Sequence, residues 1–277
     1  MIHSDFHIHS NASYDSSYTL DRIIEDCEKR GFESYGIADH VNYNETMFLD
    51  AMVESSRTVR AAQEKNSKIL LGVELTPITK VEYDYLRAHG GNREGFVAPL
   101  SDKPMEMELA VTKEEMIAVG IQYAVGASHW RVDVVDRRTP GTVDEFIKDW
   151  YRQQLYLACD ERVTILGHPW YHGAGLWYED FSVIPKSMNE EIGAALLENG
   201  KYVECNTDVI CSPKTSEKYR YQYAEFLREY FEKGIPVTIG SDSHNSYRDH
   251  SEEIEKYLSA AGFRDGDFSL LDKNKLW

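Results

Sequence analysis

The sequence predicts an α/β fold in which seven parallel strands form a barrel. Strand-like apolar runs alternate with helical patterns along the chain, which favours parallel pairing through right-handed crossovers. The runs are almost continuously apolar, as expected for strands that are buried on both faces. Residue types that bind metals follow nearly every run, whereas an open doubly wound sheet gathers its site around one switch point. A barrel therefore fits the sequence better than an open sheet does.

The predicted strands are short apolar runs, each of which ends at a polar residue able to bind a metal or to orient a group beside one. They cover residues 2–6, 35–38, 69–73, 123–127, 163–166, 202–205 and 236–239. Because the carboxyl ends of barrel strands lie on the same side, the residues that follow them are expected to meet at one mouth.

Helical patterns separate these strands. In the first one, Leu20, Ile23, Ile24 and Cys27 fall on one helical face, and Gly31 supplies a C-terminal stop. Further helices are predicted over residues 46–63, 112–119, 143–159, 189–198, 215–233 and 251–261.

One stretch, residues 76–111, shows no clear period and contains turn-forming residues between His89 and Gly95. An irregular segment of this length is usually functional or mobile. Two interpretations remain open, an insertion that forms a flap over the mouth or a surface hairpin. Barrels commonly reach this length as one unit, so we expect a single domain over residues 1–277.

Composition and charge narrow the class of protein. The chain is 42% hydrophobic and 28% charged, which is typical of a globular protein with a large core. Its formal net charge of −17 argues against nucleic-acid binding, which usually requires a basic patch. An anionic small molecule remains compatible with this charge, because bound divalent ions reverse the local field.

The sequence shows no sign of export or of membrane insertion. Its first residues lack the basic and apolar regions of a signal peptide, and no apolar run approaches the length of a membrane span. Cys27, Cys159, Cys205 and Cys211 show no Cys-x-x-Cys spacing, so neither a thiolate zinc site nor a disulfide framework is indicated. We expect a cytoplasmic protein with reduced thiols and no membrane partner.

Histidines and carboxylates gather where the predicted strands end. The richest segments are Asp5-Phe-His7-Ile-His9, Ala38-Asp39-His40, Gly72-Val-Glu74, Ala127-Ser-His129, Leu166-Gly-His168-Pro and Gly240-Ser-Asp242-Ser-His244. Imidazole and carboxylate groups together are ligands of zinc, manganese or iron. Residues two apart on a strand point to the same face, so His7 and His9 can converge on one ion. A carboxylate offers two oxygens, so Glu74 can bridge two ions. The sequence therefore predicts a metal-dependent hydrolase.

Taken in order from His7 to His244, these segments resemble the polymerase and histidinol phosphatase (PHP) family. The segments around Glu204-Cys-Asn206-Thr207 and Ser269-Leu-Leu-Asp272 also resemble its histidinol-phosphatase branch. The resemblance implies a distorted seven-stranded, TIM-like (β/α)7 barrel that holds three divalent ions.

The resemblance also implies which residues bind each ion. The ligands would be His7, His9, Glu74 and Asp242 for the first, Glu74, His129 and His168 for the second, and Asp15, His40 and His244 for the third. Relatives commonly have histidine at the position of Asp15, so this chain departs from the pattern there. The extra carboxylate favours a harder or different third metal. Asp39 is expected to orient a histidine, and Asp5 to do the same or to form a turn.

The predicted chemistry is phosphoryl hydrolysis. Two ions bridged by a carboxylate lower the pKa of a shared water, and the resulting metal-bridging hydroxide would attack phosphorus. Asp242 or His244, if not wholly occupied as a ligand, could supply the proton that the leaving alkoxide needs. Arg131, two residues after His129, is the candidate for binding phosphate, although an ordinary ion pair would also explain it. Asn206 follows the sixth strand, where it could bind substrate or cap a turn.

Three classes of function fit these residues to different degrees. The first is a phosphomonoesterase acting on a small phosphorylated metabolite, with L-histidinol phosphate as the leading substrate by resemblance. The alternative is a hydrolase of a phosphodiester, a nucleotide or an amide on the same barrel. A non-catalytic metal-binding module is disfavoured because the set of ligands is complete. The sequence does not indicate the oligomeric state.

Overall fold

The computed structural model describes residues 1–41, 48–81, 84, 107–129, 131–132, 141–171, 180–247 and 251–277. Its main sheet has seven parallel strands in the order β1–β2–β3–β6–β7–β8–β9, which confirms the predicted α/β barrel. The strands are β1 (Ser4–Ile8), β2 (Ser34–Val41), β3 (Ile69–Leu75), β6 (Tyr123–Gly126), β7 (Ile165–Leu166), β8 (Tyr202–Asn206) and β9 (Val237–Gly240).

The ring of strands is nearly closed, and β1 meets the segment that follows β9. Ile8 and Ser243 form a single parallel bridge. The His9 N–H donates to the Ser243 carbonyl at 3.0 Å, and the Asp242 N–H donates to the His7 carbonyl at 2.7 Å. The closing segment therefore carries two predicted ligands directly beside two others.

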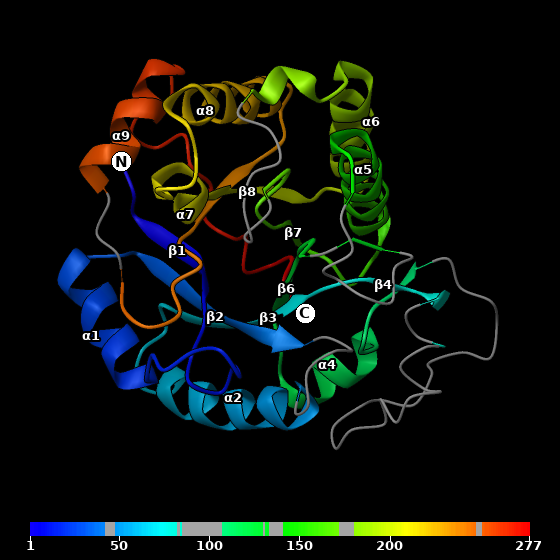
Figure 1. Ribbon diagram of the computed structural model, residues 1–277. Coiled ribbons are helices and arrows are strands. Elements are labelled where there is room, and N and C mark those ends of the chain that lie inside the picture. Colours follow the sequence, from blue (N-terminus) through cyan, green and yellow to red (C-terminus); the bar gives the residue numbers. More distant parts are fainter. Residues whose placement is uncertain are drawn as a thin grey trace.

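Helices surround the ring of strands (Figure 1). They are α1 (Leu20–Arg30), α2 (Phe48–Gln63), α4 (Lys113–Val119), α5 (Val143–Cys159), the 3-10 helix η1 (Phe181–Val183), α6 (Lys186–Glu198), α7 (Thr207–Cys211), α8 (Glu217–Glu232) and α9 (Ser251–Ala260). No helix in the described part of the chain is both long enough and apolar enough to cross a membrane.

Local sequence signals explain where several helices begin and end. Gly31 ends α1 with a left-handed φ of 71°, and its N–H bonds the Cys27 and Glu28 carbonyls. Thr112 is the N-cap of α4 and Thr142 is the N-cap of α5, each in a capping box with the glutamate three residues later. The predicted stop at Gly31 is thus observed, and the bounds of α5 match the predicted 143–159 helix.

Some elements differ from the prediction. β7 has two residues, whereas residues 163–166 were expected to be a strand. α6 begins three residues before the predicted 189. The short helix α7 directly after β8 was not predicted. Within the aperiodic 76–111 stretch, β4 (Ile78–Thr79) pairs with β5 (Met107–Glu108) in antiparallel fashion. Most residues between these two strands lie outside the described part, so the choice between a flap and a hairpin stays open.

Tyr123 packs across the inner side of the strands. Its ring extends from β6 over the positions of Gly72 on β3 and Gly36 on β2, where a Cβ atom would lie 2.4 Å and 2.0 Å from Tyr123 atoms. Its hydroxyl donates to the Phe6 carbonyl on β1 at 2.8 Å. The two glycines therefore make room for one large ring, which packs with Phe6, Leu70 and Val125 in a buried cluster.

Candidate metal centre

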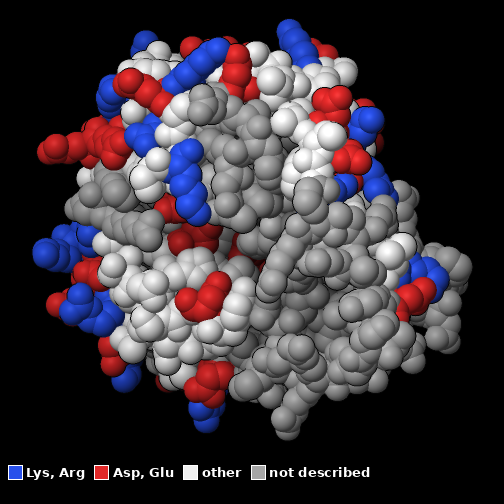
Figure 2. All heavy atoms as spheres, in the orientation of Figure 1, with Lys and Arg blue, Asp and Glu red and all other residues white. Residues whose placement is uncertain are grey.

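A hollow opens in the face of the molecule shown in Figure 2, and acidic side chains lie deep within it. The cavity has a volume of about 370 Å³, and its lining includes Asp15, Asp208, Asp242 and His244. Three of these residues are predicted ligands, so the cavity leads directly to the predicted metal centre.

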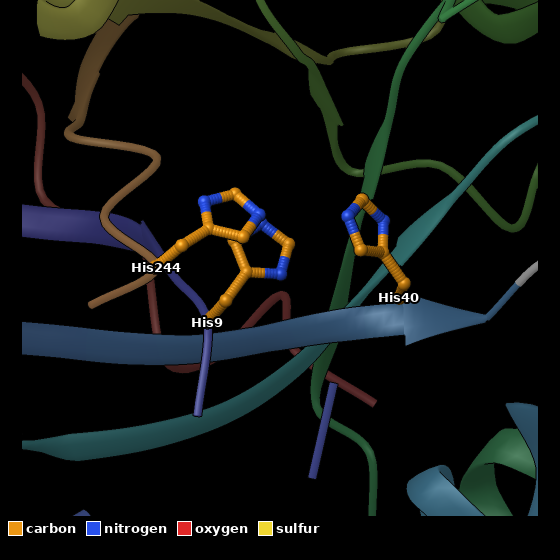
Figure 3. Close-up of side chains that lie close together, drawn as sticks. All are labelled: His9, His40 and His244. Atoms are coloured by element: carbon orange, nitrogen blue, oxygen red, sulfur yellow. The ribbon is translucent and has the colours of Figure 1, made fainter. Parts of the chain in front are cut away.

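One group of predicted ligands brings together His9, His40 and His244 from distant segments (Figure 3), with the carboxylate of Asp15 beside two of them. Asp15 Oδ2 lies 3.3 Å from His40 Nε2 and 3.3 Å from His244 Nε2. The ring of His9 stacks on that of His244, with centroids 4.0 Å apart. Ring nitrogens of His9, His40 and His244 all lie within 4.8 Å of one another. Asp15, the residue that departs from the family pattern, thus faces the two histidines with which it was grouped.

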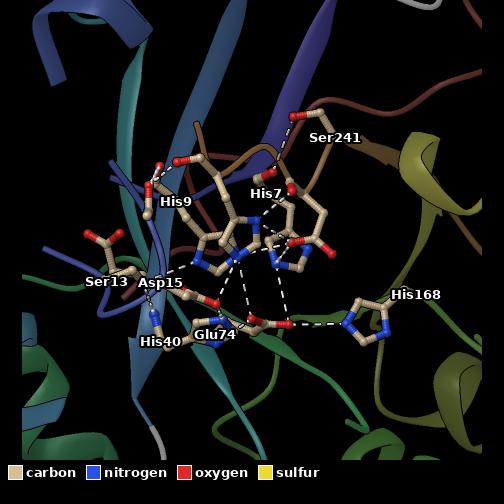
Figure 4. A network of polar contacts seen from close by, with 12 residues as sticks. His7, His9, Ser13, Asp15, His40, Glu74, His168 and Ser241 are labelled. Atoms are coloured by element: carbon tan, nitrogen blue, oxygen red, sulfur yellow. Dashed lines mark hydrogen bonds and ion pairs between the residues drawn. The ribbon is translucent and has the colours of Figure 1, made fainter. Parts of the chain in front are cut away.

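Glu74 lies at the centre of the network (Figure 4). It is fully buried at the end of β3. Its Oε1 lies within 3.2–3.4 Å of the Nε2 atoms of three histidines, His168, His129 and His7. Its Oε2 lies 3.5 Å from His9 Nε2 and 2.8 Å from His40 Nδ1. One carboxylate therefore faces five imidazole rings, as expected of a bridging ligand.

Another group of predicted ligands, His7, His9 and Asp242, joins β1 to the segment after β9. Asp242 Oδ1 lies 3.2 Å from His9 Nε2 and 3.7 Å from His7 Nε2. Ligand atoms of these three residues lie within 4.8 Å of one another. The spacing of two residues between His7 and His9 thus places both rings on one side, as expected from the strand geometry.

The distances fit ligands around an ion better than they fit direct hydrogen bonds. Ligands about 2.1 Å from a tetrahedral ion lie about 3.4 Å from one another, and most of the N···O distances above are 3.2–3.7 Å. His7 Nε2 and His9 Nε2 are buried atoms without a hydrogen-bond partner among the described residues. Buried polar atoms are normally satisfied, so a divalent cation suits these two atoms.

The electrostatics of two ligands, Glu74 and His9, favour cation binding as well. Burial opposes the charge of Glu74, but His129, His7 and His40 outweigh burial and hold its pKa well below the usual range. Burial lowers the pKa of His9 to about 3, with neighbouring His40 and His244 adding to the effect. His9 is therefore neutral near pH 7 and able to donate its lone pair.

Two further buried carboxylates hold the loops that carry the ligands. Asp5 Oδ1 accepts from the N–H groups of His7 and Ser241, each at 3.0 Å. Asp39 accepts from the N–H and the hydroxyl of Ser10 at 2.6 and 2.8 Å. Asp39 thus acts on His9 through the residue that follows it, and Asp5 ties the start of β1 to the segment after β9.

Glu204, on β8, had no predicted role, yet its carboxylate lies within the centre. It is 1% exposed, and its Oε1 lies 2.7 Å from His7 Nδ1. The available signal was a single glutamate within the otherwise apolar run from residue 202 to residue 205, a strand predicted to be buried on both faces. A buried charge without a partner is costly, so that pattern alone indicated a partner nearby.

The two predicted substrate-binding residues already have partners in this structure. Arg131 Nε pairs with Asp149 Oδ2 of α5 at 3.1 Å, and the guanidinium lies 5.1 Å from the centre of the Phe146 ring. Asn206 is fully buried, and its Oδ1 accepts from the Val209 N–H as the N-cap of α7. A role for either residue in substrate binding stays a prediction.

A family model described as the PHP domain matches residues 5–208. No curated protein matches the sequence.

Among solved structures, the chain is similar to a histidinol phosphate phosphatase from Lactococcus lactis subsp. lactis Il1403, solved with zinc, L-histidinol and phosphate. The TM-score is 0.66 at 18% identity, over 99% of this chain and 98% of that chain. At this identity the likeness shows a shared fold. A Xaa-Pro dipeptidase with bound methionine matches with a TM-score of 0.39 at 13% identity, over 94% of this chain and 70% of that chain. That likeness is too weak to carry an argument.

Proposed function

The chain belongs to the PHP domain family, and from this premise we propose that it is a metal-dependent phosphomonoesterase. The observation that carries the proposal is the position of Glu74, whose two oxygens face five histidine rings from β1, β2 and the segments after β6 and β7. A carboxylate of this kind can hold two cations side by side, which is the arrangement of two-metal hydrolytic sites.

We assign the ligands of three divalent ions from the three groups of side chains. The sets are His7, His9, Glu74 and Asp242 for the first ion, Glu74, His129 and His168 for the second, and Asp15, His40 and His244 for the third. Zinc, manganese and iron all suit this mixture of imidazole and carboxylate. The oxygen ligand at Asp15 favours a harder metal in the third set.

The residues of the centre have distinct roles in the proposed reaction. The ions, when bound, would lower the pKa of a shared water and neutralise charge on the phosphoryl oxygens. Glu74, with its depressed pKa, stays a carboxylate and keeps the ligand sets of the first and second ions together. Asp242 and His244 line the cavity, so whichever of them is not wholly occupied as a ligand can pass a proton to an alcohol that leaves on that side.

The proposed substrate is a small phosphomonoester. Three cationic centres complement the three non-bridging oxygens of a terminal phosphate better than they complement a neutral amide. The net charge of −17 disfavours nucleic acid. L-Histidinol phosphate is the first ester to test, because the similar zinc-containing phosphatase was solved with L-histidinol and phosphate. That similarity extends to the fold, so the proposal is the class of phosphomonoesters and this ester is one candidate.

Metal content provides the first test. Protein reconstituted separately with zinc, manganese and iron should bind more than one equivalent, and up to about three, by elemental analysis. The variant His168→Asn should lose metal. The variant His3→Asn is the matched control, because His3 is half-exposed and pairs with Asp265 at 2.6 Å outside the centre. A chain that binds no metal with any of the three would contradict the proposal.

Substrate preference provides the second test. The metal-loaded enzyme should hydrolyse phosphomonoesters faster than a phosphodiester, a nucleotide or an amide, and inorganic phosphate should inhibit competitively. Faster cleavage of a diester or an amide, together with indifference to phosphate, would assign the same centre to one of those bonds instead.

A further inference from the structure

We infer that Glu204 is a positioning residue that fixes His7 and His168 together, so that the ligand sets of the first and second ions are built as one unit. This inference rests on the proposed function, since it concerns how the ligands of the proposed first and second ions are held. It assigns Glu204 no contact with substrate or with an ion.

Each oxygen of the Glu204 carboxylate contacts a different ligand residue. Oε1 accepts from His7 Nδ1 at 2.7 Å, and Oε2 accepts from the His168 N–H at 2.5 Å. The side chain of Asn206 also donates to Oε2, at 3.1 Å. His7 belongs to the proposed first ion and His168 to the second, so one buried carboxylate connects both.

The contact with His7 determines which nitrogen faces the metal. A carboxylate only accepts, so His7 Nδ1 carries a proton, and in the neutral ring that binds a metal the lone pair is then on Nε2. That Nε2 lies 3.4 Å from Glu74 Oε1 and has no hydrogen-bond partner in the described structure. His9 and His129 differ from His7 here, because their Nδ1 atoms contact neutral hydroxyl groups, Ser13 Oγ at 3.3 Å and Thr76 Oγ1 at 2.8 Å.

The contact with His168 holds an unusual backbone. His168 has a φ of 21°, in the left-handed region that is costly for a residue with a side chain. Such a conformation persists where its surroundings hold it, and Glu204 Oε2 binds the N–H of this residue. The imidazole of His168 thereby reaches Glu74 Oε1 at 3.2 Å.

Gly240 on the neighbouring strand leaves the space that Glu204 occupies. A Cβ atom at position 240 would lie 1.8 Å from Glu204 Oε1 and 2.7 Å from His7 Cβ. Alanine at this position must therefore displace the carboxylate or the histidine. Gly240→Ala gives an independent way to disturb the same contact while leaving Glu204 in the chain.

Glu204→Gln is the sharpest substitution, because it keeps the size of the side chain and changes one oxygen to an amide. An amide group can accept from His7 or from the His168 N–H, but its NH2 end cannot accept from the other. If the NH2 faces His7, it donates to Nδ1 and favours the tautomer with the proton on Nε2. A protonated Nε2 has no lone pair with which to bind the first ion. Loss of such a support costs roughly 10- to 100-fold in metal affinity.

The experiment measures the affinity of each zinc equivalent by competition with a chelator, in the full chain. Asp15→Asn identifies the equivalent that belongs to the third ion. Glu204→Gln should lower the zinc affinities of the other two equivalents by roughly 10- to 100-fold and leave the affinity of the third equivalent unchanged. Gly240→Ala should give the same pattern, and the double variant should lose less than the sum of the two, since both act on one contact.

Glu108→Gln is the matched control, because Glu108 pairs with Arg162 at 2.6 Å ahead of the amino end of β7. It should leave all zinc affinities unchanged. Equal weakening of all three equivalents by Glu204→Gln, or no weakening, would overturn the inference. If both variants fold, additive effects in the double variant would overturn it as well. If Glu204→Gln failed to fold, the inference would be overturned by Gly240→Ala having no effect on the first two equivalents, or an equal effect on all three. A wild-type chain that binds no metal would instead refute the proposed function itself.

Discussion

Replacing Glu74 by glutamine tests the centre most directly. The substitution keeps the size of the side chain but removes the negative charge that faces five histidines. Because the pKa of Glu74 is held well below its usual range, the wild-type residue is a carboxylate at every pH near neutrality. Glutamine therefore changes the charge at all those pH values and leaves the packing of β3 nearly intact.

The expected magnitude follows from the charges that Glu74 would hold together. Two doubly charged ions about 4 Å apart repel each other by roughly 17 kcal/mol at an effective dielectric constant of about 20. One carboxylate about 2.1 Å from each ion attracts the pair by roughly 30 kcal/mol on the same scale. A neutral amide does not offset the repulsion, so Glu74→Gln should lose at least one ion. Because even one lost electrostatic contact costs about 10²–10³ in kcat, we expect a fall of about 10³-fold or more.

Elemental analysis and steady-state kinetics on a phosphomonoester check this expectation, with Glu108→Gln as the control for loss of a partly buried carboxylate elsewhere. Circular dichroism of both metal-free variants would establish that the fold is retained. If Glu74→Gln kept all its metal and more than about a tenth of its activity, Glu74 would be structural, and the assignment of a bridged pair would fail.

Two further predictions concern Arg131 and Lys201. If Arg131 leaves Asp149 to bind phosphate, Arg131→Ala should weaken phosphate inhibition and lower kcat/KM by roughly 10- to 100-fold. Asp149→Ala, the control, should change neither. Equal effects of the two variants would assign Arg131 to the ion pair alone. Burial lowers the pKa of Lys201 from its ordinary 10.5 to about 8, while its Nζ donates to the Asp160 and Val163 carbonyls. Between those pH values the unfolded chain binds more protons, so the free energy of unfolding should rise from pH 8 to 10.5 relative to Lys201→Met in urea titrations; a constant difference would contradict the shift.

The fold was predictable because its signals are local. Seven apolar runs, each followed by a polar residue, indicated the strands, and Gly31 marked the end of α1 through its left-handed conformation. The elements that the sequence prediction missed or made too long have local causes too. α7 has five residues and follows β8 directly, so its apolar residues merge with those of the strand. β7 pairs through two residues, fewer than the apolar run around it suggests.

The partners of individual side chains were harder to predict than the ligand types. Because Arg131 lies two residues after His129, we expected its side chain at the mouth of the barrel. In the structure it pairs with Asp149 and lies beside the Phe146 ring, both on α5. Asn206 follows a strand end, as a substrate-binding residue often does, but its Oδ1 caps α7. In both cases the competing partner belongs to a helix whose position depends on the packing of the whole barrel.

The seam between β1 and the segment after β9 shows what spacing along the chain could and could not reveal. His7 and His9 lie on one side of the seam, and Asp242 lies on the other. The spacing of two residues predicted that His7 and His9 share a face, but pairing them with Asp242 requires the first and last strands to meet. Among described residues that meeting shows one bridge, between Ile8 and Ser243, and the backbone bonds of His9 and Asp242 beside it. An ion held by all three side chains would span the seam, so the same residues that predict the chemistry would also help to close the barrel.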